Sequence, residues 1–95
     1  MGPVRLVDAG GIGVERVESG DIVVMRSFDA GLSPLVLLAG GIVSELGGPL
    51  SPGSVLAREF GVPMVAGVSA ATTGLRDGEP VRVDGDRGTV ERIGS

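Results

Sequence analysis

A glycine- and serine-rich segment at residues 47–54 holds the groups best placed for chemistry in this chain; it reads GGPLSPGS. Glycines let a backbone approach a ligand closely, and the N–H groups at the start of a helix favour an anion. If a helix begins inside this segment, it offers a small phosphate-sized cradle. The candidate anion-binding residues are therefore Gly47, Gly48, Ser51, Gly53 and Ser54.

Catalytic groups are missing from this segment and are scarce elsewhere. The chain contains no histidine and no cysteine. Without a neighbouring base, the hydroxyl of Ser51 or Ser54 is a poor nucleophile. We expect no catalytic residue, no metal site and no cofactor. Asp84 and Asp86 resemble metal ligands only superficially, because turn formation explains them better.

The segment needs a helix to position it, and the sequence predicts one. Ser51 suits the N-cap and Pro52 the first helical position, where no N–H is required. Val55, Leu56 and Phe60 form an apolar stripe at helical spacing, Gly61 ends the helix, and Arg58 and Glu59 form a solvated or locally paired face. As a cap, Ser51 should contribute about 0.5–2 kcal/mol. Capping alone explains Ser51 and Pro52, while Gly47 and Gly48 make either a tight turn or an anion-binding nest.

The remaining elements follow from apolar runs bounded by turn residues. Strands are predicted at residues 4–7, 14–17 (as part of a first hairpin), 22–25, 42–45, 64–68, 81–83 and 89–93. A helix that starts at Ser33 and Pro34 should run to Leu38 and be largely buried, because it is apolar nearly all round. One helical turn, capped at Thr72 and Thr73, is expected within residues 70–75. The pattern predicts one compact α/β domain over residues 1–95.

Composition limits the function further. The formal net charge is −4 and the eight arginines are scattered, which argues against nucleic-acid binding. The longest apolar run, residues 35–43, is too short to cross a bilayer. We expect a soluble cytoplasmic protein with no nucleic-acid or membrane partner. Phe28 and Phe60 are the only aromatics, so the core must be aliphatic.

The amino-acid alphabet is reduced. Lys, Asn, Gln, His, Cys, Trp and Tyr are all absent, so the chain uses 13 residue types. A GC-rich coding bias is one explanation. A designed or simplified version of a natural domain is the other.

Residues 47–63, GGPLSPGSVLAREFGVP, resemble the signature of the mobile domain of pyruvate phosphate dikinase, phosphoenolpyruvate synthase and related phosphotransferases. The matching positions are Gly47, Gly48, Ser51, Ala57, Arg58, Glu59, Gly61 and Pro63. The likeness extends to residues 20–24, 29–35, 75–78 and 81–88, and so to almost the whole chain. It implies a swivelling β/β/α domain.

In that family, a histidine at the start of the central helix takes a phosphoryl group at a nucleotide-binding site. It then delivers the group at a pyruvate or phosphoenolpyruvate site. The resemblance places this histidine at Pro52, which has neither a nucleophile nor an N–H. The implied partners are the nucleotide-binding and pyruvate-binding domains of a dikinase-like enzyme.

Three functions therefore stay open. The first is a non-catalytic relative that serves as a structural, docking or regulatory module, or as a designed scaffold. The second is a mobile phosphotransfer domain or subunit of a phosphoenolpyruvate synthase or dikinase-like enzyme. The third is a small phosphate-binding domain without covalent chemistry.

Overall fold

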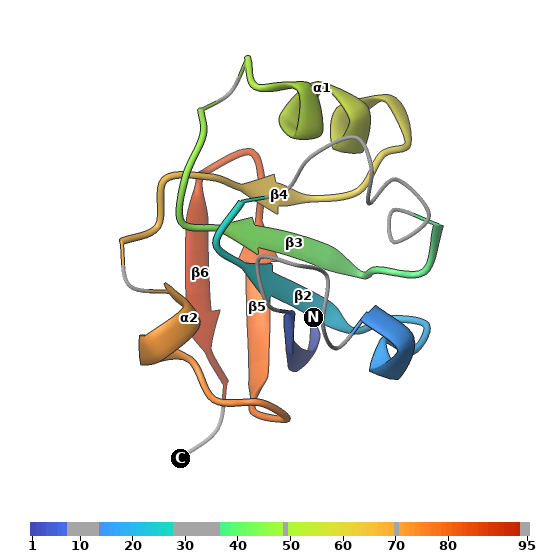
Figure 1. Ribbon diagram of the computed structural model, residues 1–95, viewed down its shortest axis with the longest axis vertical. Coiled ribbons are helices and arrows are strands. Elements are labelled where there is room, and N and C mark those ends of the chain that lie inside the picture. The colour runs from blue at the N-terminus through green and yellow to red at the C-terminus, as the bar shows by residue number, and fades with distance from the viewer. Residues whose placement is uncertain (8–13, 28–36, 49, 70, 94–95) are drawn as a thin grey trace.

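The computed structural model describes residues 1–7, 14–27, 37–48, 50–69 and 71–93 (Figure 1). The elements in chain order are β1 (Gly2–Val7), the 3-10 helix η1 (Val14–Arg16), β2 (Ile22–Met25), β3 (Gly41–Ser44), α1 (Pro52–Glu59), β4 (Met64–Val65), α2 (Ala71–Gly74), β5 (Pro80–Asp84) and β6 (Thr89–Arg92).

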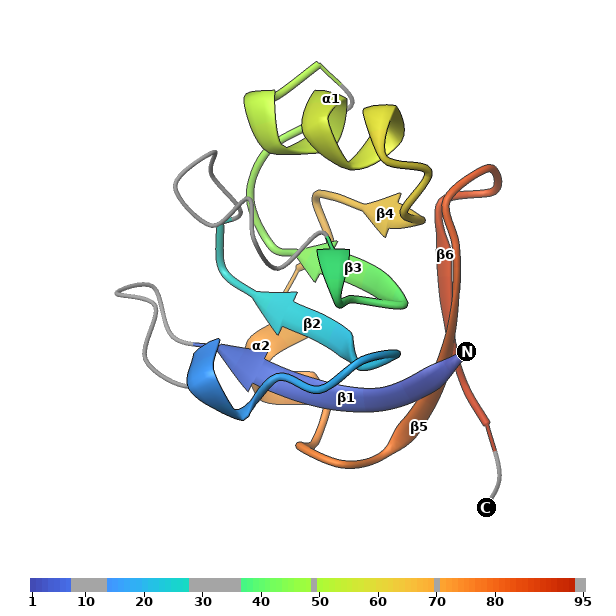
Figure 2. The same cartoon turned by 90° about the vertical axis from the view of Figure 1, so that its right-hand side faces the viewer.

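The six strands form one sheet in the order β4-β3-β2-β1-β5-β6. Strands β1, β2, β3 and β4 are parallel to one another, whereas the pairs β1–β5 and β5–β6 are antiparallel. Parallel strands need crossover connections, and α1 provides the one from β3 to β4. The predicted α/β class is confirmed. Figure 2 shows α1 above β4 and α2 behind the sheet.

The core formed by the described residues is aliphatic, as the sequence predicts, and it lies on both faces of the sheet. Val23 and Met25 of β2 pack with Ala57 of α1 in one cluster. Ile22 and Val24 pack in a second cluster that includes residues of α2 and β5. Side chains alternate along a strand, so all four residues of β2 are buried. This explains the continuous apolar run of the strand.

Helix α1 begins and ends where the sequence indicates. Pro52 is its first residue, and Ser51 has the extended backbone of an N-cap. Gly61 has φ +71°, a left-handed conformation that glycine adopts without strain. The N–H of Val62 donates to the Ala57 carbonyl at 2.9 Å and closes the last turn.

Two strand predictions are wrong in part. Residues 14–17 do not extend a hairpin; Val14–Arg16 is a 3-10 turn, because β2 runs parallel to β1 and the chain must cross over to reach it. The predicted strand at 64–68 ends at Val65. Gly67 has φ +77°, which breaks the extended backbone.

The start of the predicted helix, Ser33 and Pro34, lies outside the described residues. Its last positions are described, and there the prediction of burial is wrong. Leu37 is 74% and Leu38 44% exposed. The reason is that this stretch joins the start of β2 through its backbone: the Gly20 N–H donates to the Leu38 carbonyl at 2.8 Å. Those side chains consequently face outward.

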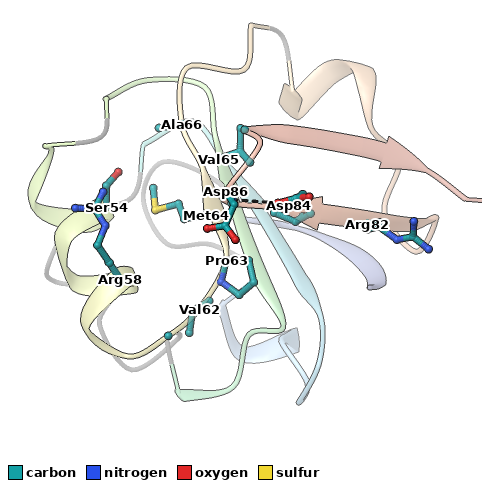
Figure 3. Close-up of a pocket in the computed structure, with 14 residues that line it drawn as sticks. Ser54, Arg58, Val62, Pro63, Met64, Val65, Ala66, Arg82, Asp84 and Asp86 are labelled. Atoms are coloured by element: carbon teal, nitrogen blue, oxygen red, sulfur yellow. Dashed lines mark hydrogen bonds between the residues drawn. The ribbon is translucent and has the colours of Figure 1, made fainter.

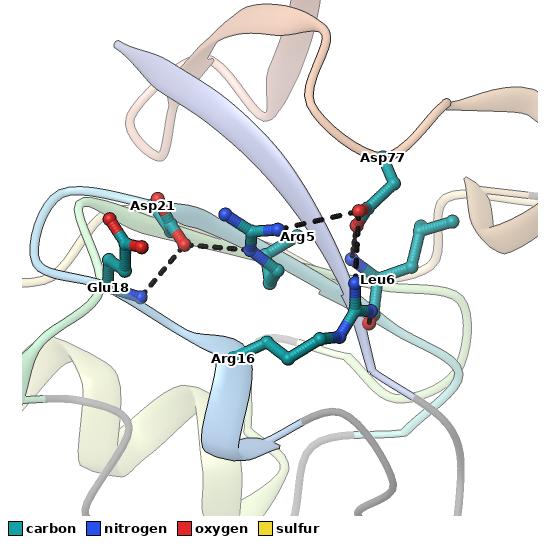
Figure 4. Close-up of polar contacts among 6 residues, drawn as sticks. All are labelled: Arg5, Leu6, Arg16, Glu18, Asp21 and Asp77. Atoms are coloured by element: carbon teal, nitrogen blue, oxygen red, sulfur yellow. Dashed lines mark hydrogen bonds and ion pairs between the residues drawn. The ribbon is translucent and has the colours of Figure 1, made fainter.

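Polar contacts tie β1 to its neighbours where strand pairing ends (Figure 4). Asp77 accepts the Leu6 N–H at 2.9 Å and forms ion pairs with Arg5 and Arg16 at 3.4 and 3.3 Å. The buried Asp21 accepts from Arg5 Nε at 3.0 Å. The hydrogen bond from the Leu6 N–H is the main cause that lowers the pKa of Asp77 below its ordinary 3.8; Arg16 and Arg5 lower this pKa further, whereas burial opposes the shift. These contacts lie away from the α1 start.

Candidate functional site

The candidate segment connects β3 to α1 and turns at Gly47. Gly47 has φ +97°, which disfavours any residue with a side chain. A Cβ there would also lie 3.3 Å from Ser51 Oγ. Gly48 has no such constraint, because no atom lies within 4 Å of where its Cβ would be. The turn therefore explains Gly47, whereas local geometry does not require glycine at position 48.

The two candidate serines bind the carbonyl oxygen of Gly48. Ser51 Oγ lies 2.9 Å and Ser54 Oγ 2.8 Å from this oxygen, and the hydroxyls are 2.9 Å apart. The Ser51 N–H donates to the same carbonyl at 3.1 Å. The three oxygens share two hydroxyl protons, so both protons are used inside what we call the Gly48–Ser51–Ser54 triangle.

The Ser51 side chain does not act as the predicted helix cap. Its hydroxyl makes no cap hydrogen bond to the helix, although its backbone occupies the N-cap position. Its hydroxyl instead lies against the Gly48 carbonyl and Ser54 Oγ, at 2.9 Å from each, and the contacts with these two oxygens hold it there. The Ser51 carbonyl accepts the Val55 N–H at 3.0 Å, so the helix starts through its backbone.

At the start of α1, two backbone N–H groups have no acceptor within the described part of the chain. Pro52 has no N–H, and Val55 is already bonded. Among the described residues, none accepts a hydrogen bond from the N–H of Gly53 or Ser54. Both residues are buried, and the positive end of the helix dipole lies there. These donors suit an anion, but the serine hydroxyls are committed elsewhere.

The surface around this helix start is apolar. Pro52 itself is exposed. Leu46, Leu50 and Val55 are 51%, 84% and 39% exposed. Residues 47–54 contain no charged side chain. A histidine in place of Pro52 would follow an uncharged segment and stand at an exposed position.

A groove of about 650 Å³ lies on the other side of Ser54. Figure 3 shows Ser54 and Arg58 on the α1 side, Asp84 and Asp86 on the β5–β6 hairpin, and Met64 of β4 between them. Asp84 is a turn residue, as predicted: its Oδ1 accepts the N–H groups of Asp86 and Arg87 at 3.1 Å each. Within the described residues, no group of three or more side chains could hold a metal ion.

The sequence does not predict one interacting pair of residues beside the site. Glu45 follows β3, and its Oε2 accepts from the Thr72 N–H at 2.8 Å and from Thr72 Oγ1 at 2.6 Å. The Thr72 hydroxyl, and then its N–H, lower the pKa of Glu45 below its ordinary 4.5. The sequence predicts Thr72 and Thr73 as the cap of a helical turn, and this is wrong in position, because both lie inside α2. No sequence signal pairs Thr72 with a residue 27 positions away.

No helix among the described residues is long and apolar enough to cross a membrane.

Comparisons with known proteins show which proteins this chain is similar to. A family model described as "PEP-utilising enzyme, mobile domain" matches residues 17–88, more than half of the chain. A rifampicin phosphotransferase of Streptomyces sviceus is 45% identical over 75 residues, which cover 79% of this chain and 9% of that protein. A phosphoenolpyruvate synthase of Aeropyrum pernix is 40% identical over 76 residues, 80% of this chain and 9% of that protein.

A solved structure shares the fold. The NMR solution structure of an Enzyme I protein superposes with a TM-score of 0.70 at 25% identity, and the match covers 83% of this chain and 33% of that one. The chain spans only 9% of the length of the two curated relatives. Those relatives therefore contain much more chain than this domain.

Proposed function

The chain belongs to the mobile-domain family of PEP-utilising enzymes, and we propose that it is a mobile docking domain that carries no phosphoryl group of its own. The observation that supports this proposal is Pro52. It is the exposed first residue of α1, where the family resemblance places the phosphohistidine. A proline ring offers no lone pair that could attack phosphorus, and the chain contains no histidine.

The proposed partners are nucleotide-binding and pyruvate-binding domains of a dikinase-like protein. The relatives are about ten times longer than the matched region, so domains of this family occur within larger proteins. The exposed apolar side chains of Leu46, Leu50 and Val55 provide a surface on which another domain can rest. Docking and phosphoryl transfer are separable in this proposal.

The test is phosphoryl labelling with a dikinase-type nucleotide-binding domain and ATP labelled in its transferable phosphate. We expect the natural chain to take up no acid-labile phosphate, and Pro52→His to take it up. Leu50→His is the matched control, because it places an exposed histidine two residues earlier, outside the helix. Acid-labile label on the natural chain would refute the proposal. Equal labelling of both histidine variants would show that the helix start has no special role.

A second candidate is a phosphotransfer domain whose acceptor lies on another chain. The printed names of the two relatives, a phosphotransferase and a synthase, favour it. It predicts that label reaches a partner chain only when this domain is present. The docking-only proposal predicts that removing the domain leaves partner labelling unchanged.

A third candidate is a phosphate-binding domain without covalent chemistry. The buried N–H groups of Gly53 and Ser54 favour it. A designed scaffold, the interpretation suggested by the reduced alphabet, predicts neither labelling nor docking. Measuring the binding of the natural chain to the partner domain therefore separates the docking module from the scaffold.

A further inference from the structure

The segment that leads into α1 is anchored before it reaches the turn. The N–H groups of Glu45 and Leu46 donate to the carbonyls of Met25 and Arg26, at 3.1 and 2.8 Å. The buried Ser44 Oγ donates to the Leu46 carbonyl at 2.8 Å and fixes the bend. Residues 44–46 are thus held on the β2 side of the sheet by their backbone.

The opposite side of this segment is held by α2 and the loop before it. The Val68 N–H donates to the Ser44 carbonyl at 3.1 Å. The half-buried Glu45 spans the remaining gap, because its Oε2 accepts both the N–H and the hydroxyl of Thr72. This carboxylate is the side-chain link from the segment to the first turn of α2.

Helix α2 needs such a link. It has four residues, Ala71–Gly74, and a helix this short does not form alone. Ala71 is buried in the core and Glu45 accepts the next N–H along the chain. A carboxylate at a helix N-terminus is favourable because it meets the positive end of the helix dipole. The bond therefore fixes α2 as well as the segment before α1.

Gly47 follows at once, and it touches the same loop. A Cβ on Gly67 would lie 3.7 Å from the Gly47 carbonyl oxygen, so the two glycine turns are neighbours. Beyond Gly47 comes the Gly48–Ser51–Ser54 triangle, which holds the α1 start together internally. Residues 45–47 therefore determine the position and orientation of this triangle relative to the sheet.

We propose that Glu45 is a positioning residue that sets where the start of α1 lies, by holding residues 45–47 against α2. The proposal rests on the proposed function only in treating the start of α1 as the site. It predicts that a change at Glu45 or Thr72 is felt at Gly47, Gly48, Gly53 and Ser54, although neither side chain contacts them by a hydrogen bond in the described residues.

The experiment compares backbone amide shifts in Glu45→Ala and Thr72→Val with those of the natural chain. Glu91→Ala, an exposed carboxylate on β6, is the control. We expect both variants to shift the amides of Gly47, Gly48, Gly53 and Ser54 beyond the change in the control. Thr72→Ser keeps the hydroxyl and should restore the natural shifts. Changes confined to residues 71–74 would overturn the proposal, because Glu45 would then only cap α2.

A functional readout separates this inference from the proposed function. In a Pro52→His background, adding Glu45→Ala should slow labelling, whereas adding Glu91→Ala should not. If Pro52→His is never labelled, the proposed function fails while the amide shifts still test Glu45. If Glu45→Ala does not fold, Thr72→Val removes one of the two hydrogen bonds and leaves the carboxylate in place. Labelling at an unchanged rate in the folded double variant would contradict the positioning role of Glu45.

Discussion

The N-termini of the two helices of this domain differ in the groups that surround their backbone N–H donors. At α2, the protein supplies its own anion, and the Glu45 carboxylate accepts the N–H and hydroxyl of Thr72. At α1, residues 47–54 carry no charge, and the hydroxyls of Ser51 and Ser54 turn to a carbonyl oxygen. The Thr72 N–H at α2 is therefore satisfied by a side chain of the protein, whereas within the described part of the chain the N–H groups of Gly53 and Ser54 at α1 have no acceptor.

This difference indicates what each helix is for. A helix start that the protein satisfies itself stabilises the fold. A helix start that keeps unsatisfied donors costs stability unless water or a ligand meets them, and such costs are tolerated where they serve a function. At α1 the two N–H groups without an acceptor in the described residues stand beside Pro52, the position at which the family resemblance implies a histidine. The following predictions test whether the two starts really differ in this way.

The largest effect is expected at the glycine turns that precede the two helices. Gly47→Ala and Gly67→Ala each force a side chain into a left-handed backbone, which costs about 1–2 kcal/mol. Urea unfolding measures the loss. Gly48→Ala is the control, because its Cβ would meet no atom within 4 Å. An equal loss at position 48 would show that the positive φ at Gly47 is not what matters.

The next effect concerns the Gly48–Ser51–Ser54 triangle. Ser51→Ala removes one of its two hydroxyls but leaves Ser54 Oγ on the Gly48 carbonyl. The free energy of unfolding should fall by about 0.5–1.5 kcal/mol, the net value of one hydrogen bond. The double variant Ser51→Ala with Ser54→Ala should lose more than the sum of the single changes, because the carbonyl is then left without either hydroxyl. Simple additivity would mean that the two hydroxyls act independently.

A pH titration should reveal a carboxylate at the α2 start. Because the pKa of Glu45 is lowered below 4.5, its contribution to stability is complete above that pH and is lost as the pH falls through the lower, folded value. The Thr72 amide should shift with a midpoint below 4.5, and Glu45→Gln should abolish this titration. If Glu45 positions the α1 start, Gly47 and Gly48 should show smaller shifts with the same midpoint. A Thr72 midpoint at or above 4.5 would contradict the hydrogen bonds described above.

The smallest effect is expected from phosphate. Two N–H donors without a cationic side chain should bind it only at millimolar concentrations, and the amides of Gly53 and Ser54 should move first. At a concentration equal to Kd, the stabilisation is about 0.4 kcal/mol. The Thr72 amide should not respond, because a carboxylate already occupies its N–H. In the Glu45→Ala variant the Thr72 amide should respond to phosphate, so the same titration tests both helix starts. Equal responses at both starts of the natural chain would remove the distinction between them.

Much of the fold could be predicted from the sequence, because the decisive patterns are local. The apolar run Ile22–Met25 predicted a strand, and the structure has that strand, with all four residues buried. Pro52 and Gly61 mark the limits of α1, because proline fits where no N–H is needed and glycine fits a left-handed end. The Asp84 turn depends on atoms within three residues, and it was predicted too. The candidate site was located by the same local features.

What only the tertiary structure decided is which partner each polar group takes. Ser51 carries the signature of a helix cap, yet its hydroxyl meets Gly48 instead, because the turn at Gly47 brings that carbonyl within 2.9 Å. Residues 14–17 alternate like a strand but form a crossover, because β2 pairs parallel to β1. Glu45 and Thr72 are 27 residues apart and meet because α2 packs against the sheet to which β3 belongs. The sequence determines where elements begin and end through short-range sterics, whereas hydrogen-bond partners depend on distances that exist only once the sheet has assembled.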